Sequence, residues 1–272
     1  MNRIDRRFAE LKAAGRRGLI PFVTAGDPAP DATVAVLHAL VDAGADLIEL
    51  GVPFSDPMAD GPVIQHANER ALARGVGLAQ ILAWVREFRV KDAATPLVLM
   101  GYLNPIESYG FERFGRDAVA AGVDGVLLVD CPVEESATAA PLRAAGLRQI
   151  FLAAPTTAAA RLAQLRERAE GFLYYVSFAG ITGADRLSVE TVRKRVATIK
   201  AGLDLPVAVG FGVRDAESAA AIAAFADAVV IGSALVERLA ASSSAHKACA
   251  EARGFLAPIR KALDGVTAAH AA

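Results

Sequence analysis

Short apolar runs alternate along the chain with longer amphipathic stretches. Most of the short runs are apolar on both faces, which is typical of parallel strands covered by helices. Each run is followed by a stretch with apolar residues at a spacing of 3.6, the pattern of an amphipathic helix. The predicted strands are residues 19–24, 46–50, 97–102, 125–129, 149–153, 172–176, 206–210 and 228–231.

The amphipathic stretches predict helices with clear stop signals. Glycine follows several of them directly, as at Gly44 and Gly122, and a glycine just past the last turn commonly ends a helix. A short amphipathic helix also begins the chain, where Ile4, Phe8 and Leu11 share one face. The predicted helices that follow the strands include residues 31–43, 78–89, 111–121, 137–145, 158–169, 189–201 and 216–226.

Eight strand–helix units in succession predict an α/β protein, a single (β/α)8 TIM barrel with an extra N-terminal helix. The alternative is an open, doubly wound sheet. The G-x-G-x-x-G fingerprint that a dinucleotide-binding sheet carries after its first strand is missing after Thr24. No linker or shift in composition divides the chain, so we predict one domain over residues 1–272.

Composition narrows the possible partners and the compartment. The net charge of −1 leaves no surplus of Lys and Arg to neutralise phosphates, which argues against nucleic acid. Cys131 and Cys249 form no disulfide framework, so we expect a reducing cytoplasm. No signal peptide and no apolar run of about 18 residues is present, so no membrane association is expected. The 4 histidines lack ligand spacing, so we predict no metal.

Two carboxylates stand out at and after the second predicted strand. Glu49 lies where a buried strand should carry an apolar residue, and Asp60 ends a loop stiffened by prolines. If Ile48 faces the helices, Glu49 points into the barrel mouth, where catalytic groups of such barrels gather. Burial should raise the pKa of Glu49, while a more solvated Asp60 should stay ionised and accept a substrate N–H. The alternatives are a buried ion pair for Glu49 and ordinary turn chemistry for Asp60.

Glycines follow the last three predicted strands. They occur in the runs 180–183, 210–212 and 232–233, and they include Gly183, Gly212 and Gly232. Loops after strands seven and eight of such barrels commonly bind phosphate, and a helix that begins at Ser233 would offer free N–H groups to an anion. Turns need glycine in any case, so each glycine alone is weak evidence.

An apolar substrate pocket is also predicted at the barrel mouth. Phe22, Met100, Leu127 and Tyr174 lie on predicted strands, and an apolar lining with a few polar groups is typical of a small-molecule site. Tyr102 and Asn104, just past the third strand, add polar groups. The alternative is that these side chains are simply barrel core.

Taken together, these motifs resemble the tryptophan synthase α chain family, in the family's order and over nearly the whole chain. The loop PFSDPxADGP is by far the most specific of them. The segments that carry the resemblance are PFVTAGDP at 21–28, ADLIELGVPFSDPMADGPVIQHA at 45–67, NPI at 104–106, DCPVEES at 130–136, GITG at 180–183, GFGV at 210–213 and GS at 232–233.

The resemblance implies a (β/α)8 lyase that cleaves indole-3-glycerol phosphate to indole and glyceraldehyde 3-phosphate, in tryptophan biosynthesis. By position, Glu49 is the general acid and base, and Asp60 stabilises the protonated indole. Phe22, Tyr102 and Tyr174 are expected to contact the substrate. Thr182 is expected in a loop that closes over it. The phosphate binders are expected to be Gly183, Gly212, Gly232 and Ser233.

The resemblance also implies a partner, the tryptophan synthase β chain, in an α2β2 heterotetramer. No cofactor is expected in this chain, and pyridoxal phosphate is expected in the β chain. The docking surface should include Pro53 and Asp56 of the second loop and residues 130–134. One departure is Phe178, where many similar chains carry a charged or small residue.

Three other functions remain open at this point. The first is the same cleavage by an enzyme that needs no partner and releases free indole. The second is a catalytically silent subunit that only activates a β chain, although Glu49 and Asp60 are both present. The third is a sugar-phosphate isomerase on the same barrel, which would share the phosphate loops but would leave the apolar pocket and the proline-rich loop unexplained.

Overall fold

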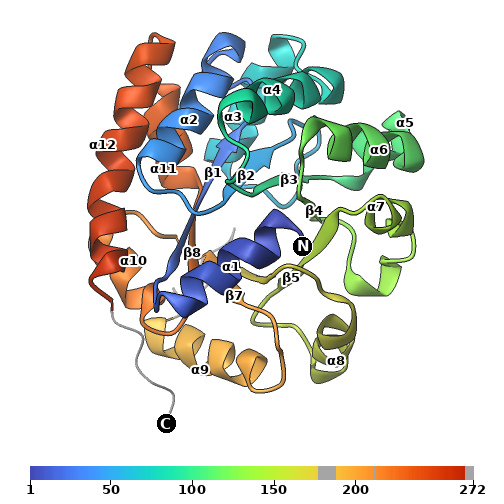
Figure 1. Cartoon of the computed structure of the whole chain (residues 1–272), viewed down its shortest axis with the longest axis vertical. Coiled ribbons are helices and arrows are strands. Elements are labelled where there is room, and N and C mark those ends of the chain that lie inside the picture. The colour runs from blue at the N-terminus through green and yellow to red at the C-terminus, as the bar shows by residue number, and fades with distance from the viewer. Residues whose placement is uncertain (177–187, 211, 267–272) are drawn as a thin grey trace.

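The computed structural model describes residues 1–176, 188–210 and 212–266, and these residues form a closed barrel of eight parallel strands surrounded by helices (Figure 1). Strand β1 pairs with both β2 and β8, which closes the sheet. The predicted barrel is therefore confirmed. The strands are β1 Gly18–Thr24, β2 Ile48–Gly51, β3 Leu97–Gly101, β4 Gly125–Leu128, β5 Arg148–Ala153, β6 Leu173–Val176, β7 Val207–Gly210 and β8 Ala228–Ile231.

Helices cover the outside of the barrel, and most of them lie where the periodicity predicts. Three lie outside the predicted set: α3, which begins at Pro62, α5, which contains Pro105, and the short η2, which follows Pro132. The helices are α1 Arg3–Ala13, η1 Pro30–Ala32, α2 Thr33–Asp42, α3 Pro62–Ala73, α4 Leu78–Lys91, α5 Leu103–Tyr109, α6 Phe111–Ala121, η2 Val133–Glu135, α7 Ala140–Ala144, α8 Ala159–Arg168, α9 Val189–Lys200, α10 Ala216–Ala223, α11 Ser233–Ala240 and α12 Ala245–Asp264.

Side chains alternate along each strand between the barrel interior and the helices. Leu47 belongs to the interior cluster, together with residues of the other strands such as Val98. Ile48 and Leu50 pack in the outer layer, which the strands share with the helices. Position 49 therefore faces the interior, as the sequence predicted.

The N-terminal helix α1 lies across one end of the barrel (Figure 1). Its apolar face, Ile4, Phe8 and Leu11, joins the interior cluster. The ring centroids of Phe8 and Phe172 are 5.5 Å apart. Helix α1 therefore closes the end of the barrel at which the strands begin, so a ligand has to enter at the other end.

Acids that precede the strands organise this closed end. Asp46 accepts the N–H of Leu19 at 3.0 Å, and Asp124 accepts that of Leu97 at 2.9 Å. Asp227 accepts the N–H of Val207 at 2.8 Å. Because each acid lies before one strand and binds the N–H of the preceding strand, it clamps one strand–helix–strand unit. Asp46 is thus a clamp outside β2, which begins at Ile48 rather than at the predicted residue 46.

The outermost parts of the chain also meet in this fold. Helix α12 packs against α2 and α10, and β1 pairs with β8. The single domain over residues 1–272 stays a prediction, which this packing of both chain ends supports. Within the described part of the chain, no helix is long and apolar enough to cross a membrane.

Candidate active site at the carboxyl end of the barrel

Glu49 lies inside the barrel in the middle of β2, beside Phe22 of β1 and Val98 of β3 in the strand register. Its side chain is fully buried, and neither carboxyl oxygen has a hydrogen-bond partner among the described residues. Burial disfavours the charged carboxylate, and it raises the pKa of Glu49 to about 8. The alternative for Glu49 was a buried ion pair, and the described part of the chain supplies no cation that pairs with it. Glu49 therefore holds a proton at neutral pH.

Asp60 lies at the end of the loop between β2 and α3, and it is half-buried. Burial raises its pKa to about 6, while hydrogen bonds from the side chains of Tyr102 and Asn68 act in the opposite direction. The expectation that solvent keeps Asp60 ionised thus needs a correction. The protein partly buries this carboxylate and stabilises its charge with two donors. Asp60 is ionised at neutral pH, when Glu49 is still protonated.

Tyr102 anchors the loop that carries Asp60. Its hydroxyl accepts the backbone N–H of Ala59 at 3.1 Å, and its ring lies 5.1 Å from that of Phe54, between centroids. Burial and the charge of Asp60 raise the pKa of Tyr102 to about 12, so the hydroxyl remains a donor. Tyr102 follows β3 as the cap of α5 and is buried. The side chain thus contacts the loop of the second acid, while a contact with substrate stays a prediction.

Aromatic and apolar side chains line the space between the acids and the glycines. Phe22 belongs to a small cluster with Ala67 of α3 and Val236 of α11, and Met100 packs against it. Tyr174 packs against the interior cluster, and its pKa is raised well above 10 by burial and by the charge of Glu49. Leu127 is fully buried deeper in the interior. Phe22, Met100 and Tyr174 therefore border the mouth, while Leu127 is core.

The glycines after β7 and β8 border the same mouth. A Cβ atom at Gly232 would lie 3.7 Å from the Cβ of Phe22 and 4.0 Å from the Cδ1 of Ile64. Gly212 adopts a φ of +49°, a conformation that favours glycine. Ser233 is exposed and begins α11, whose first N–H groups have no partner within the helix. This arrangement can bind an anion at the end of an apolar pocket.

Three predicted positions, Thr182, Gly183 and Phe178, lie outside the described residues. One further site residue, Asn68, was not predicted from the sequence, because the helix that carries it, α3, was not predicted. The helix has recognisable signals, since Pro62 lies in its first turn and Gly75 follows its end with a φ of +75°. If α3 had been predicted from these signals, Asn68 would have been placed about two turns into the helix that follows Asp60, where its side chain can reach that residue.

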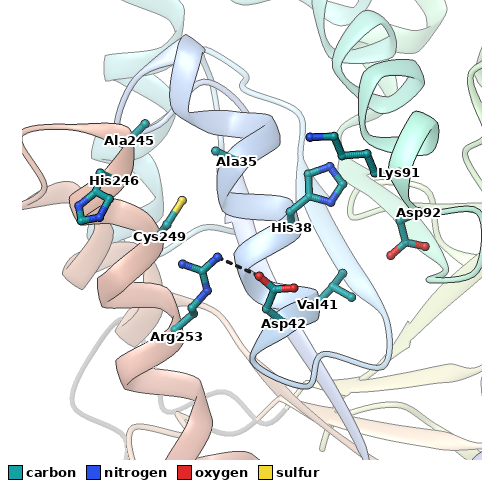
Figure 2. Close-up of a pocket in the computed structure, with 10 residues that line it drawn as sticks. All are labelled: Ala35, His38, Val41, Asp42, Lys91, Asp92, Ala245, His246, Cys249 and Arg253. Carbon is teal, nitrogen blue, oxygen red and sulfur yellow. Dashed lines mark hydrogen bonds and ion pairs between the residues drawn. The ribbon is translucent and has the colours of Figure 1, made fainter.

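One hollow of the described structure lies away from this chemistry. A surface groove of about 640 Å³ lies between α2, the end of α4 and the start of α12 (Figure 2). In it, Asp42 and Arg253 form an ion pair at 2.8 Å, beside His38, His246 and Cys249. It is on the outside of the barrel, so it is separate from Glu49. The described residues contain no group of three or more His, Cys, Asp or Glu side chains arranged to hold a metal ion.

The arrangement at the barrel mouth pairs a protonated acid with an ionised one. Glu49 can donate a proton to a carbon or oxygen atom and then accept one from a hydroxyl. Asp60 can accept a hydrogen bond and stabilise a positive charge that develops on a bound ring. With apolar side chains and glycine turns beside them, the groups suit a substrate with an aromatic part and a phosphate.

Comparison with known proteins places the chain in a family. A model of the family "Tryptophan synthase alpha chain" matches residues 8–263. The tryptophan synthase alpha chain of Xylella fastidiosa (strain 9a5c) is 60% identical over 267 residues, which cover 98% of this chain and 100% of the relative. That of Laribacter hongkongensis (strain HLHK9) is 59% identical over 265 residues, which cover 97% of this chain and 100% of the relative.

Solved structures agree with this relationship. The crystal structure of tryptophan synthase subunit alpha from Legionella pneumophila str. Paris superposes with a TM-score of 0.92 at 45% identity, covering 98% of this chain and 100% of that one. A ligand-free tryptophan synthase from M. tuberculosis superposes with a TM-score of 0.86 at 36% identity, covering 97% and 99%. Sequence and fold agree, and the chain belongs to the tryptophan synthase alpha chain family.

Proposed function

We propose that this chain cleaves indole-3-glycerol phosphate to indole and glyceraldehyde 3-phosphate in a retro-aldol reaction, as the α subunit of tryptophan synthase. Membership of the family makes it a lyase of tryptophan biosynthesis. The observation that carries the mechanism is that Glu49 is fully buried without a hydrogen-bond partner among the described residues, while half-buried Asp60 accepts a hydrogen bond from Asn68. These environments separate the two carboxyl pKa values, to about 8 for Glu49 and about 6 for Asp60. Two acids whose environments separate their pKa values can divide acid and base roles between them.

In the first step, protonated Glu49 donates its proton to the indole ring carbon that bears the glycerol side chain. The ring nitrogen, still carrying its hydrogen, then shares the positive charge. Asp60 accepts the hydrogen bond from this N–H and stabilises the cation, because the fixed carboxylate needs little reorganisation. Phe22 and Met100 offer an apolar surface to the ring.

In the second step, the Glu49 carboxylate removes the proton from the side-chain hydroxyl on the carbon next to the ring. The bond between that carbon and the ring breaks, and its electron pair returns to the ring. The hydroxyl carbon becomes the aldehyde of glyceraldehyde 3-phosphate, and indole leaves with the proton gained first. Glu49 ends protonated, as it began, so the cycle balances without an added reagent.

The phosphate end of the substrate is proposed to bind at the glycines after β7 and β8. Gly212, Gly232 and Ser233 present backbone groups there, and the start of α11 favours negative charge. Gly232 lies beside Phe22, so one molecule can contact the anion site and the apolar pocket together. Thr182 and Gly183 stay predicted contacts from the loop after β6.

A β chain is the proposed partner, in an α2β2 heterotetramer, with pyridoxal phosphate bound in the β chain and no cofactor in this one. A groove of about 420 Å³ beside the Asp60 loop supports a docking surface there, between the loop and α3. The side chain of Met58 is 79% exposed in it, which is unusual for a large apolar residue. Asp56 is exposed as predicted, whereas Pro53 is buried and can act only from below the surface.

The experiment that tests this function is an assay of indole release from indole-3-glycerol phosphate, with and without an added β chain. Strong acceleration by the β chain supports the subunit role, and equal rates support an enzyme without a partner. No cleavage under either condition, with isomerisation of a sugar phosphate instead, would exclude the proposal.

Two variants test the mechanism in the same assay. Glu49→Gln should lower the cleavage rate by about 10²–10⁴, the range for a positioned general acid or base. Asp60→Asn should lower it steeply as well, because the amide carries no charge to stabilise the cation. A Glu49→Gln protein that cleaves at nearly the original rate rules out the role given to Glu49. If Asp60→Asn changes only phosphate affinity, the placement of the indole ring is wrong.

A further inference from the structure

Helix α3 connects the loop of the second acid to the body of the barrel. Its Ala67 is fully buried in the cluster with Phe22 and Val236. On the same helix, the guanidinium of Arg70 donates to both carboxyl oxygens of Asp27 at 2.7 and 2.9 Å. An apolar contact and a two-bond ion pair therefore hold α3 in place. A side chain on its buried face has a fixed position relative to the barrel mouth.

Asn68 lies on that buried face, and its side chain is directed at the second acid. It is only 3% exposed, and its Nδ2 donates to Oδ2 of Asp60 at 3.3 Å. A buried amide is costly unless it is hydrogen-bonded, so an apolar residue would be the default choice at this position. One turn earlier, Nε2 of Gln65 donates to the backbone carbonyl of Asp60 at 2.8 Å. Helix α3 thus holds both the main chain and the carboxylate of Asp60.

We propose that Asn68 is a positioning residue for the cleavage reaction: it orients the Asp60 carboxylate toward the barrel mouth and keeps it ionised there. This role rests on the proposed function, since it assumes that ionised Asp60 accepts the indole N–H. Asn68 itself touches no reacting atom. The amide N–H forms a stronger hydrogen bond with a charged acceptor than with a neutral one. Asn68 therefore favours the carboxylate form of Asp60 over the carboxylic acid.

The groups around Asp60 define what a titration would report. Tyr102, at the end of β3, is a second donor to the carboxylate, and its hydroxyl does not ionise near pH 6. Asp130, after β4, acts on Tyr102. Glu49, inside β2, has a pKa of about 8 and keeps its proton while Asp60 titrates. A change in the pKa of Asp60 in an Asn68 variant can therefore be assigned to the loss of the Asn68 amide, because these neighbouring groups do not titrate near pH 6.

The test compares Asn68→Leu and Asn68→Ala with the unmodified chain, with aspartate carboxyl carbons labelled with ¹³C. The Asp60 signal is assigned by its loss in Asp60→Asn, and its chemical shift is followed from pH 4 to pH 9. We expect the midpoint to rise by about one pH unit in both variants, the size of one lost hydrogen bond to a charged group. The acid limb of kcat/KM for indole-3-glycerol phosphate should move by the same amount.

The matched control is His66→Ala on the same helix, since the His66 side chain is 65% exposed and pairs at the surface with Glu69, away from Asp60. It should leave the Asp60 midpoint and kcat/KM unchanged. The Leu and Ala variants differ in bulk but share the loss of the amide, so the Ala variant decides if the Leu variant does not fold. An unchanged midpoint in a folded variant overturns the proposal.

The kinetic data separate this proposal from the proposed function. If the unmodified chain does not cleave indole-3-glycerol phosphate, the function is wrong, and the positioning role in that reaction is overturned with it. If it cleaves, and the variants lose activity equally at all pH values without a shift of the Asp60 midpoint, only the role of Asn68 is wrong. If the loss is about tenfold below pH 6 and small near pH 7.5, both stand.

Discussion

The two ends of the barrel bury carboxylates in opposite ways. At the closed end, Asp124 is 3% exposed and pairs with Arg3 and Arg89, both at 2.9 Å, and it also accepts the N–H of Leu97. At the open end, Glu49 is 0% exposed and has no partner among the described residues. Both acids face the same cost of desolvation. Only Asp124 offsets this cost, through the neighbouring N–H donor and the two arginine cations.

The segment that leads into strand β2 shows the same contrast within the four residues from Asp46 to Glu49. Burial raises the pKa of Asp46, but the N–H of Leu19 and the charge of Arg260 act against it. Three residues later, burial acts alone and raises the pKa of Glu49 to about 8. A buried acid with partners is a structural clamp, because its charge is needed where it lies. A buried acid without partners exchanges a proton near neutral pH, which is what the proposed reaction requires.

The largest expected effect on stability tests the closed end. Asp124→Ala should lower the free energy of unfolding by about 5 kcal/mol, because it leaves Arg89 buried without its charge partner and Leu97 without an acceptor. Urea unfolding, followed by circular dichroism, measures the change. The control is Asp42→Ala, whose exposed pair with Arg253 should contribute less than about 1 kcal/mol. Equal effects of the two substitutions would remove the distinction between clamp and surface pair.

An effect of similar size and opposite sign is expected at the open end. Glu49 titrates near 4.5 when unfolded and near 8 when folded. Between these values the folded chain holds a proton that the unfolded chain has lost, so the free energy of unfolding falls as pH rises. Glu49→Gln removes this term. The variant should be more stable than the unmodified chain by roughly 5 kcal/mol at pH 9, at about 1.4 kcal/mol per pKa unit.

The two proteins should unfold almost alike near pH 4.5, where the folded chain keeps the Glu49 proton and the unfolded chain has lost it in only half of the molecules. Urea unfolding at pH 4.5, 7 and 9 gives the comparison. A Glu49→Gln chain that is less stable at pH 9 would mean that Glu49 has a charged partner, and the contrast between the two ends would fail.

The smallest expected effect concerns the anion site. Gly232→Ala places a methyl group in ordinary van der Waals contact with Phe22 and Ile64, at 3.7 and 4.0 Å. We expect it to fold normally but to crowd the proposed phosphate position. The KM for indole-3-glycerol phosphate should rise about tenfold, or about 1.4 kcal/mol, with little change in kcat. An unchanged KM would place the phosphate elsewhere.

The architecture was largely readable from the chain. Apolar runs on both faces predicted all eight strands, with differences of one or two residues at their ends. Helices α3 and α5 were missed, since Pro62 and Pro105 made their segments resemble loops. Proline is tolerated in the first turn of a helix, where its missing N–H would be unpaired anyway. A proline therefore does not indicate a loop when it lies in the first turn of a helix.

The two acids of the site were predicted from the sequence, but the hydrogen bonds that join them to their neighbours were not. Glu49 stood out because an acid interrupts an apolar strand, and the family motif identified Asp60. The bonds from Tyr102 and Asn68 to Asp60 join residues that are 42 and 8 positions away in the chain, and neither has a spacing that signals a contact. The partly buried state of Asp60 depends on these contacts, which is why solvation was overestimated from its loop position.

The sequence by itself determined the order of the strands, the face of each side chain and the family, because periodicity and short motifs are local properties. It placed Glu49 inside the barrel through the alternation of β2. Only the tertiary structure decided how each buried acid behaves. Asp46 and Glu49 lie on the same segment, and their different roles follow from which donors and cations the closed barrel brings to them. Burial and partners are set by residues far apart in the chain, so the pKa of an acid is a property of the fold.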